Sequence, residues 1–331
     1  MDNVGRKAFW DMLCSLKNYN QESRQQLREV APIPHELCRF RTVNEQSLLQ
    51  LQNNEMLFST ANYYDDPFDT YFSIDFPSLK SIYGIVRSMV AGGDTKWLLE
   101  MLHMIGLDNN VDAIIKSLGT TELDMNTLEL SLIDIRKMIQ RQINSICFCE
   151  NPLNETTWLK YAGQHKGFVQ VYDFNDQETK LCGNDAKCDK CGIAKYPPMI
   201  CPVYYTDLVY DATSYALNLL VQTVFSKQLL EFPESVLELF YINAAWQNEK
   251  ISLIKKECHQ YDLEWRMILP TQFTSRPMIK WRPKSIMIGL NTPEYQRRLI
   301  ISAAHIAGIN EIYQVIINDY DRLDKEKILE D

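Results

Sequence analysis

An acidic pair at the start of an apolar run is the first candidate for chemistry in this sequence. Residues 259–269 read HQYDLEWRMIL, so that Asp262 and Glu264 come directly before a largely apolar stretch. A spacing of two puts both carboxylates on the same side of an extended strand. Because like charges repel, one carboxyl group should hold its proton or both should meet a cation or several donors. The alternative is an edge strand whose acidic side chains face water, with Arg266 paired locally.

Two arginines form a second candidate. Alternation along Leu37–Arg41 puts Arg39 and Arg41 on one face of a predicted strand. A pair of guanidinium groups suits a bidentate anion such as phosphate. The alternative is a pair of solvent-facing arginines on an edge strand. Further along, three aspartates around Pro67 either shape a turn or orient Arg39 or a ligand hydroxyl. They are Asp65, Asp66 and Asp69.

The third candidate is an aromatic segment that follows Cys147-Phe148-Cys149. It contains Trp158, Tyr161 and His165, and Gly167 begins the next predicted strand. Aromatic rings and an imidazole suit the stacking of a planar ligand, and a glycine allows close approach of the backbone. The alternative is a short helix over Glu155–Tyr161, in which the Trp and Tyr are core anchors. The residues alone leave both interpretations open.

A cysteine cluster lies in a loop predicted over residues 175–202. Two thiolates separated by two residues can bind one tetrahedral Zn²⁺, and one more thiolate from each side would complete a structural site. The alternative is a set of reduced thiols in a loop. The four candidate zinc ligands are Cys182, Cys188, Cys191 and Cys201.

Composition restricts the class of protein. The chain has 331 residues, of which 46% are hydrophobic and 23% are charged, as in globular proteins with a sizeable core. A net charge of −9 argues against a general binder of nucleic acids or anionic membranes, but it allows a local basic groove. The N-terminus lacks the pattern of a signal peptide, and no apolar stretch is long enough to span a bilayer. We therefore expect a soluble, cytoplasmic protein with reduced cysteines.

The hydrophobic pattern mixes short strands with long helical runs. It predicts one helix over residues 1–30, a helical insertion over 77–143 and a solvated charged tail over 322–331. Irregular mixing favours an α+β fold with small mixed or antiparallel sheets over a doubly wound parallel sheet. No glycine-rich phosphate loop has the required spacing. Strands are predicted at 37–41, 56–59, 145–149, 167–172, 202–205, 265–269, 285–290 and 312–317, and further helices at 44–52, 211–260 and 294–307.

Several segments, taken in order, resemble the DUF2971 family of domains of unknown function. The first is LCRFRTVNEQSLLQLQNNEMLFSTANYYDDPFDT at 37–70, and the second is ICFCE with TTWLKYAGQHKGFVQVYDF, within 146–174. The last two are YDLEWRMI at 261–268 and PKSIMIGL at 283–290. The resemblance implies one domain over 1–331, interrupted by the helical insertion and by the cysteine loop.

The order of these segments is also similar to that of the ADP-ribosyltransferase superfamily. This resemblance implies an enzyme that cleaves the nicotinamide–ribose bond of NAD and modifies an acceptor. It assigns NAD binding to Arg39, completion of the catalytic site to Glu264, and the role of partner acid to Asp262. Cys149 stands where a serine is expected. The residues implied to bind the nucleotide are Arg41, Ser59, Asp66, Trp158, Tyr161 and His165.

The resemblance leaves the biological role and the acceptor open. Compact transferases of this sort are often toxins or phage-defence effectors, and the acceptor is an unknown macromolecule, with nucleic acid disfavoured but not excluded by the acidic balance. One alternative function is a non-catalytic sensor or interaction module, with the zinc loop and the aromatic segment as its binding face. Another is a metal-dependent nuclease or hydrolase that uses Asp66, Asp69 and Glu264 on Mg²⁺.

Overall fold

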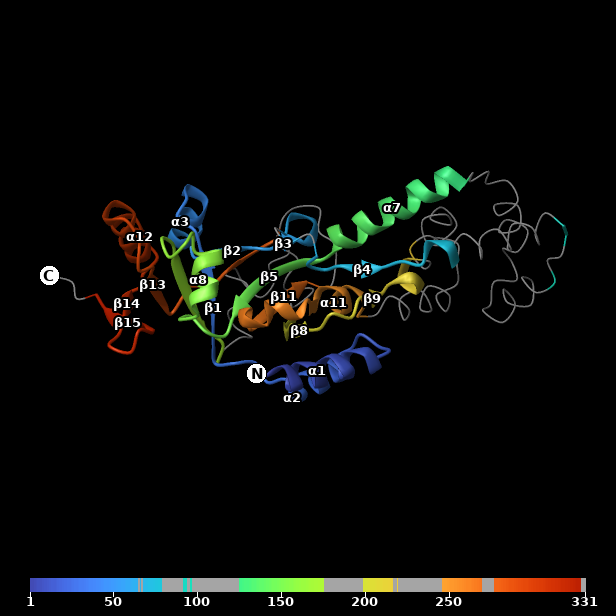
Figure 1. Ribbon diagram of the computed structural model, residues 1–331, viewed down its shortest axis with the longest axis horizontal. Helices are drawn as coiled ribbons and strands as arrows, with labels where there is room; N and C mark the ends of the chain where they lie inside the picture. The colour runs from blue at the N-terminus through green and yellow to red at the C-terminus, as the bar shows by residue number, and fades with distance from the viewer. Residues whose placement is uncertain are drawn as a thin grey trace.

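A nine-stranded, mostly antiparallel sheet is the centre of the fold (Figure 1). The computed structural model describes residues 1–64, 66, 68–78, 92–93, 96, 125–175, 199–216, 219, 246–269 and 277–328. The strand order is β15-β14-β13-β6-β1-β5-β11-β7, and β3 pairs with β5. These strands are β1 (Glu36–Arg41), β3 (Ser59–Thr60), β5 (Asn144–Cys149), β6 (Phe168–Asp173), β7 (Met199–Pro202), β11 (Glu264–Leu269), β13 (Ser285–Ile288), β14 (Ile312–Ile317) and β15 (Leu323–Lys327).

The predicted mixture of helices and antiparallel strands is confirmed, but the predicted small sheets are wrong in size. Most of the strands belong to one sheet. In it β1 pairs with β5 and β6, and β5 also pairs with β11, although these strands lie far apart in the sequence. Three two-stranded pairs lie outside it: β10–β8 and β4–β9 are parallel, and β12–β2 is antiparallel. Their bounds are β2 (Glu55–Leu57), β4 (Phe72–Ser73), β8 (Tyr204–Tyr205), β9 (Tyr210–Asp211), β10 (Ile254–Lys255) and β12 (Met278–Lys280).

The predicted single helix over residues 1–30 is wrong, because two helices occupy this stretch. They are α1 (Asn3–Ser15) and α2 (Gln21–Val30). The backbone leaves the helical conformation at Leu16, and the Asn20 side chain accepts a hydrogen bond from the Ser23 amide to begin the second helix. Asparagine at this position satisfies an amide that the first turn leaves unpaired, so the polar interruption ends one helix and caps the next.

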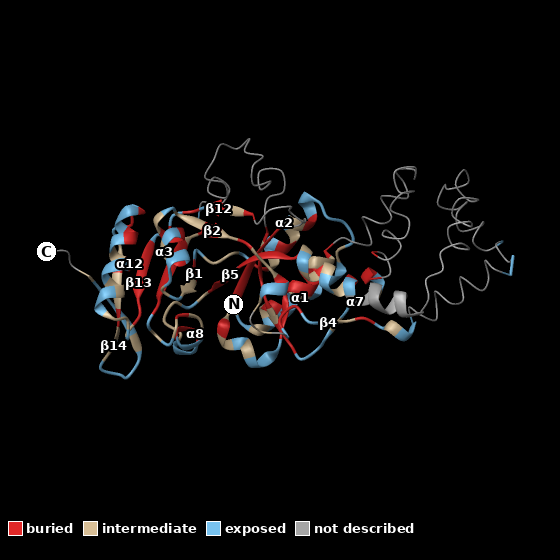
Figure 2. Cartoon of the chain, turned by 90° about the horizontal axis from the view of Figure 1, so that it is seen from above, coloured by how far each residue is buried: buried red, intermediate tan, exposed pale blue. Residues whose placement is uncertain are grey.

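Helices cover both faces of the sheet. The apolar side chains of α1 and α2 pack in one core cluster with those of β5, β7 and β11. On one face of β6 and β13, α3 (Glu45–Gln52) and α12 (Glu294–Ile306) pack against each other over Phe168 and Ile288. On the opposite face, Trp158 of α8 (Glu155–Tyr161) packs over Val169 and Met287. The strands are mostly buried and the outer surfaces of the helices are exposed (Figure 2). The remaining helices within the described residues are η1 (Ala61–Tyr63), α7 (Met125–Gln142), α11 (Gln247–Ser252) and η4 (Glu257–Asp262).

The predicted solvated tail is confirmed over residues 324–327, which are exposed, and residues 323–327 form the edge strand β15. This strand pairs with β14 from Ile317↔Leu323 to Tyr313↔Lys327. Its side chains are nearly all exposed and charged, which suits the edge of a sheet because charges discourage pairing with another chain.

A tight turn between α8 and β6 brings the aromatic segment against β1. Gly163, Gln164 and His165 all have positive φ. A Cβ placed on Gly167 would lie 2.1 Å from the carbonyl oxygen of Arg41. Gly167 is therefore required by the close packing of this turn on β1, rather than by the approach of a ligand.

Only part of the predicted helical insertion lies within the described residues. There α7 extends away from the sheet (Figure 1), and its C-terminal half packs Ile135 and Ile139 into a separate core cluster. The described part does not include residues 79–91, 97–124 and 220–245. Over these ranges the helical insertion and the helix predicted at 211–260 stay predictions. Among the helices that the structure describes, none has the length and apolarity needed to cross a membrane.

Candidate functional site

The main sheet splits between β1 and β5. These strands pair only at Cys38↔Cys149, whereas β1 pairs with β6 along its whole length and β5 pairs with β11 along its whole length. Beyond that contact, β1 and β5 run in different directions (Figure 1). The far end of β5 instead pairs with β3, at Ser59↔Ser145. The split opens a gap within the sheet itself.

A pocket of about 500 Å³ fills this gap. Consecutive residues of each strand line it, namely 38–40 of β1 and 145–147 of β5. Consecutive side chains of a strand point to opposite faces, so a pocket reaches both only where the sheet is open between the strands. The remaining lining residues are Ser59, Tyr63, Tyr64, Asp66, Asp69, Cys149, Lys160, Tyr161, Lys255, Asp262 and Glu264.

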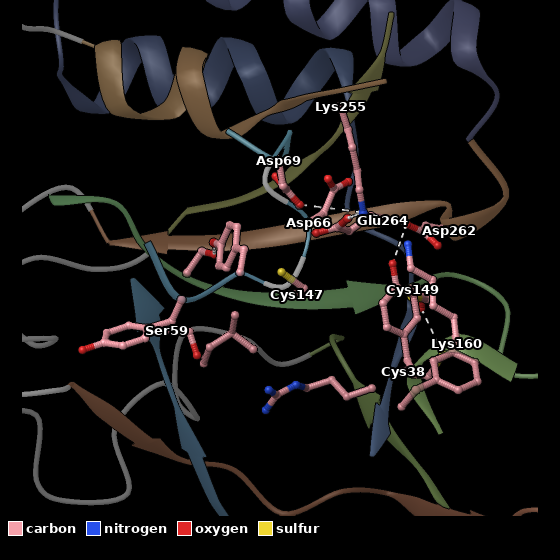
Figure 3. Close-up of a pocket in the computed structure, with 17 residues that line it drawn as sticks. Cys38, Ser59, Asp66, Asp69, Cys147, Cys149, Lys160, Lys255, Asp262 and Glu264 are labelled. Atoms are coloured by element: carbon pink, nitrogen blue, oxygen red, sulfur yellow. Dashed lines mark hydrogen bonds and ion pairs between the residues drawn. The ribbon is translucent and has the colours of Figure 1, made fainter. Parts of the chain in front are cut away.

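Lys255 links the two acidic residues of the predicted pair. Its Nζ atom lies 2.7 Å from Oδ2 of Asp262 and 2.9 Å from Oε2 of Glu264, and 3.8 Å from Oδ2 of Asp69. Figure 3 shows the lysine reaching into the pocket among these carboxylates. All four side chains are buried. The predicted repulsion between Asp262 and Glu264 is therefore balanced by a shared cation.

The predicted geometry of the acidic pair is wrong in one respect. Asp262 ends the 3₁₀ helix η4 and does not belong to the strand, because Leu263 adopts a left-handed conformation with φ 42°. The strand begins at Glu264. The two carboxylates meet through this local reversal and through Lys255, not through the period of a strand.

Arg266 provides a second cation for Glu264. Its Nε lies 2.6 Å from Oε1 of Glu264, and its Nη2 lies 2.7 Å from Oδ2 of Asp69. Burial opposes the charged form of Glu264, but Arg266 and Lys255 hold the pKa of this carboxyl well below its usual range. Glu264 is therefore an ionised carboxylate at neutral pH.

Two buried carboxylate oxygens in the pocket have no hydrogen-bond partner. They are Oδ1 of Asp69 and Oδ1 of Asp262. The other oxygen of Asp262 accepts from Lys255 and from the Tyr161 hydroxyl, which lies 3.0 Å away. An unsatisfied buried acceptor costs free energy, but both oxygens lie beneath the pocket surface, so a ligand would reach them only if neighbouring side chains moved.

Arg6 of α1 fixes the start of β11 from behind the pocket. This fully buried guanidinium donates to the carbonyl oxygens of Glu264 at 2.6 Å and Val203 at 2.9 Å, and to the Glu150 carboxylate at 2.7 Å. The Glu264 amide donates to the hydroxyl of Tyr205 at 2.7 Å. Both main-chain groups of Glu264 are thus held, so its side chain has a defined position.

The polar rim of the pocket connects Lys160, His259 and Asp66. Nε2 of His259 lies 3.0 Å from Oδ2 of Asp66, and Nδ1 lies 3.2 Å from Nζ of Lys160. Burial, Lys255 and Lys160 lower the pKa of His259. The neutral imidazole therefore donates from Nε2 to Asp66 and accepts from Lys160 at Nδ1.

The pocket brings together six of the predicted site residues. Arg39 lines it, with its guanidinium carbon 5.9 Å from the centre of the Phe148 ring. Arg39 follows Cys38 on β1 and so points to the opposite face of the sheet, but the split opens the pocket to both faces. The six residues are Arg39, Ser59, Asp66, Tyr161, Asp262 and Glu264.

Three predicted nucleotide-binding residues do not line the pocket. Arg41 donates to the side chain of Gln50 at 2.8 Å. Trp158 is fully buried and donates to the carbonyl of Pro152, and its ring stacks on His165. The alternative interpretation, a helix over Glu155–Tyr161 with a tryptophan core anchor, agrees with the observed α8.

Three cysteines line the pocket, and one of them, Cys149, stands where the superfamily resemblance implies a serine. Burial raises the pKa of the Cys38 and Cys149 thiols, and the pKa of Cys147, whose side chain is exposed in the pocket, is raised by the surrounding protein and by the charge of Glu264. These groups are neutral thiols at pH 7. They are weak donors and apolar walls, not nucleophiles.

The predicted zinc site falls mostly outside the described residues. Cys182, Cys188 and Cys191 lie there, while Cys201 lies on β7 with its thiol buried in the same apolar cluster as α1 and α2. Burial raises the pKa of Cys201, which favours the neutral thiol and gives no support to a zinc-bound thiolate. Within the described ranges, no group of three or more Cys, His, Asp or Glu side chains is arranged to hold a metal ion.

Sequence reasoning missed the residues that surround Glu264. Lys255 follows an apolar run and was not singled out, whereas Arg266 was expected only to pair locally. Asp69 was expected to shape a turn, to orient Arg39 or a ligand hydroxyl, or to bind a metal ion. A signal was present, because a lysine and an arginine inside buried segments must pair with acids. The sequence does not say which acids.

Comparisons with family models, with curated proteins and with solved structures find no match for this chain. The site is therefore interpreted from its own residues and geometry.

Proposed function

We propose that this chain is an ADP-ribosyltransferase-like enzyme of the DUF2971 kind, which cleaves the nicotinamide–ribose bond of NAD and transfers ADP-ribose to an acceptor. The observation that carries the proposal is the convergence of Arg39 and Glu264 on one pocket. They come from β1 and β11, on either side of β5, and are separated by 225 positions in the sequence (264 − 39). The segment order that suggested the superfamily thus corresponds to neighbouring strands.

The size of the pocket supports a small-molecule substrate. At about 500 Å³ it lies in the range of pockets that bury drug-sized ligands, roughly 300–1,000 Å³. Phe40 and Tyr64 offer ring surface to a planar group. Arg39 supplies a guanidinium for a phosphate.

Glu264 has the charge state that the reaction needs. Departure of nicotinamide leaves positive charge on the ribose, and a fixed carboxylate stabilises that charge as it develops. Each Glu264 oxygen accepts one cation in this structure, and a carboxylate has about four acceptor positions. Glu264 therefore retains room for a ribose hydroxyl while Lys255 and Arg266 hold its orientation.

Among the alternatives, metal-dependent hydrolysis has less support. Lys255 lies among Asp69, Asp262 and Glu264, where it supplies the positive charge that a metal ion would bring. A non-catalytic module would not need an ionised, tightly held carboxylate in a pocket. Titration calorimetry separates the three functions: we expect heat of binding with NAD and none with Mg²⁺ or Mn²⁺, and a binding module would respond to neither.

The proposal predicts that Glu264→Gln removes NAD turnover. Loss of the carboxylate should slow nicotinamide release by at least about 100-fold, the cost of losing one charge-stabilising group. Nicotinamide release by the purified protein is measured beside Glu257→Gln, an exposed residue of η4 that should keep the parent rate. A Glu264→Gln protein as active as the parent would refute the assignment.

Because Glu264 is buried in ion pairs, we expect its variant to lose stability as well as activity. Arg39→Gln provides a second test, since Arg39 is only half-buried and lies outside the Lys255–Arg266 network. This variant should raise the KM for NAD and keep the circular dichroism spectrum of the parent. An unchanged KM would remove Arg39 from the site.

A further inference from the structure

A band of exposed rings and cations leads away from the mouth of the pocket. Tyr63, which lines the pocket, is 78% exposed, and Phe68 and Tyr71 are 51% and 44% exposed. Three exposed aromatic rings at one place on a surface indicate a site that another molecule covers. We define the aromatic–basic strip as Tyr63, Phe68, Tyr71, Arg136, Lys160 and Lys256.

Much of the strip is continuous through direct contacts that begin at the rim of the pocket. Lys160 contacts His259, which pairs with Asp66, and Asp66 accepts a hydrogen bond from the Phe68 amide at 2.9 Å. The Phe68 ring then packs edge-on against Tyr71, with ring centres 6.2 Å apart.

Each cation of the strip lies beside an aromatic ring. Lys256 Nζ is 3.9 Å from the centre of the Phe68 ring, and the Arg136 guanidinium is 5.5 Å from the centre of the Tyr71 ring. Lys160 Nζ is 4.9 Å from the centre of the Tyr161 ring, at the rim. Repeated pairs of ring and cation match a ligand in which flat groups alternate with negative charges.

We propose that the aromatic–basic strip binds single-stranded nucleic acid and presents one of its nucleotides to the pocket. Unpaired bases stack on exposed rings, and the phosphates between them meet lysine and arginine. A duplex would not fit this pattern, because its bases are stacked on each other. An acidic peptide would use the cations but would leave the rings exposed.

The role of this strand as acceptor rests on the proposed function, whereas its binding does not. In the transfer, a nitrogen or oxygen of the presented nucleotide forms a bond to C1′ of the NAD ribose. The bond from C1′ to the nicotinamide nitrogen breaks, and its electron pair neutralises the pyridinium ring. The nucleophile releases its proton to solvent. Oligonucleotide binding is therefore tested without NAD.

The overall net charge of −9 determines how the affinity for a polyanion should depend on salt. Since the rest of the molecule repels a polyanion, affinity must come from the strip and must weaken steeply with salt. Three cations contacting phosphates predict a slope of about −2 in log K against log salt for a single strand.

The test uses the full chain and fluorescein-labelled oligomers of dT and of U, each about 16 nucleotides long, the upper site size for one single-strand-binding domain. Fluorescence anisotropy should show binding to one or both, and much weaker binding to a duplex of the same length. Phe68→Ala should weaken binding by about 5-fold or more, the loss expected when one stacked base is released. Lys256→Gln should weaken it and reduce the salt slope by about 0.7.

Matched controls lie at the far edge of the sheet. Tyr320 is an exposed ring, with 83% of its surface accessible. Lys325 has its Nζ 4.7 Å from the ring centre of Tyr313 and so forms a pair of cation and ring like that of Lys256 and Phe68. Tyr320→Ala and Lys325→Gln should bind the oligomers like the parent. The inference is overturned if the parent binds neither single strand or if duplex binds equally well. It is also overturned if an oligo-glutamate peptide competes better than the oligomers, or if the control variants lose as much affinity as the strip variants. Strand binding by a protein that never releases nicotinamide would overturn the proposed function alone.

Discussion

At the scale of single residues, Lys255 holds the site together. A lysine that is 4% exposed pairs with Asp262 and Glu264, and burial alone would lower its pKa. The charges of Glu264, Asp69 and Asp262 reverse that effect and raise the pKa above its ordinary value. The lysine thus stays protonated over the whole physiological range.

Removing this cation should destabilise the fold. Lys255→Met leaves two buried carboxylates with less compensation, and breaking a buried ion pair costs about 3–5 kcal/mol. The neighbouring Lys256 is exposed, so Lys256→Met should change the unfolding free energy by less than about 0.5 kcal/mol. Urea denaturation of both variants measures the difference. Equal losses would mean that the buried network does not stabilise the protein.

At the scale of elements, the site depends on α8 and on the turn that follows it. Both must pack closely on β1. The turn passes over the end of β1, where Gly167 leaves no room for a side chain. Asn154 caps α8 by accepting from the Thr157 amide, and its side chain also donates to the Tyr261 carbonyl beside Asp262. The aromatic segment and the acidic pair are therefore positioned by the same helix N-terminus.

A methyl group at Gly167 should disturb this packing. Gly167→Ala would put a Cβ 2.1 Å from a backbone oxygen that cannot move away freely, and overpacking of this kind costs about 1–3 kcal/mol. In α1, by contrast, a Cβ on Gly5 would meet the side chains of Met1 at 3.0 Å and Asp2 at 3.3 Å, both of which can move, and alanine in a helix gains roughly 0.5–1 kcal/mol over glycine. Thermal unfolding should therefore move in opposite directions for Gly167→Ala and Gly5→Ala. A shared direction would contradict the packing described here.

At the scale of the whole molecule, a buried acid joins the N-terminal helices to the rest of the core. Glu249 of α11 is 3% exposed and lies near Arg24 of α2, Lys250, and the tyrosines at 19 and 215. Burial raises the pKa of Glu249 to about 7 from its ordinary 4.5. The folded protein therefore binds this proton more tightly than the unfolded chain does.

Stability should depend on pH through this group. The contribution of protonated Glu249 is complete below about pH 4.5 and is lost as the pH rises through about 7. Glu249→Gln does not titrate, so its unfolding free energy relative to the parent should rise by about 3 kcal/mol between pH 4.5 and pH 8, from a shift of about 2.5 pKa units. Urea midpoints at the two pH values test this, with exposed Glu257→Gln as the control. A difference that stays constant with pH would exclude Glu249 as the cause.

The sequence alone determined part of the local structure and the chemical inventory of this protein. Alternating and helical periods predicted β14 at Ile312–Ile317 and, as an alternative, α8 at Glu155–Tyr161 with the bounds that the structure has. Arg39 of β1 and the acidic pair of Asp262 and Glu264 were also recognisable, because charged groups beside apolar runs are unusual.

Only the tertiary structure decided how these residues meet. The pairing of β1 with β5 at a single position, the left-handed Leu263 and the insertion of Lys255 among three carboxylates all depend on contacts between distant segments. Hydrophobic periodicity says which face of an element is buried, but not which element covers it. The pocket arises from an opening between strands, and no local pattern encodes such an opening.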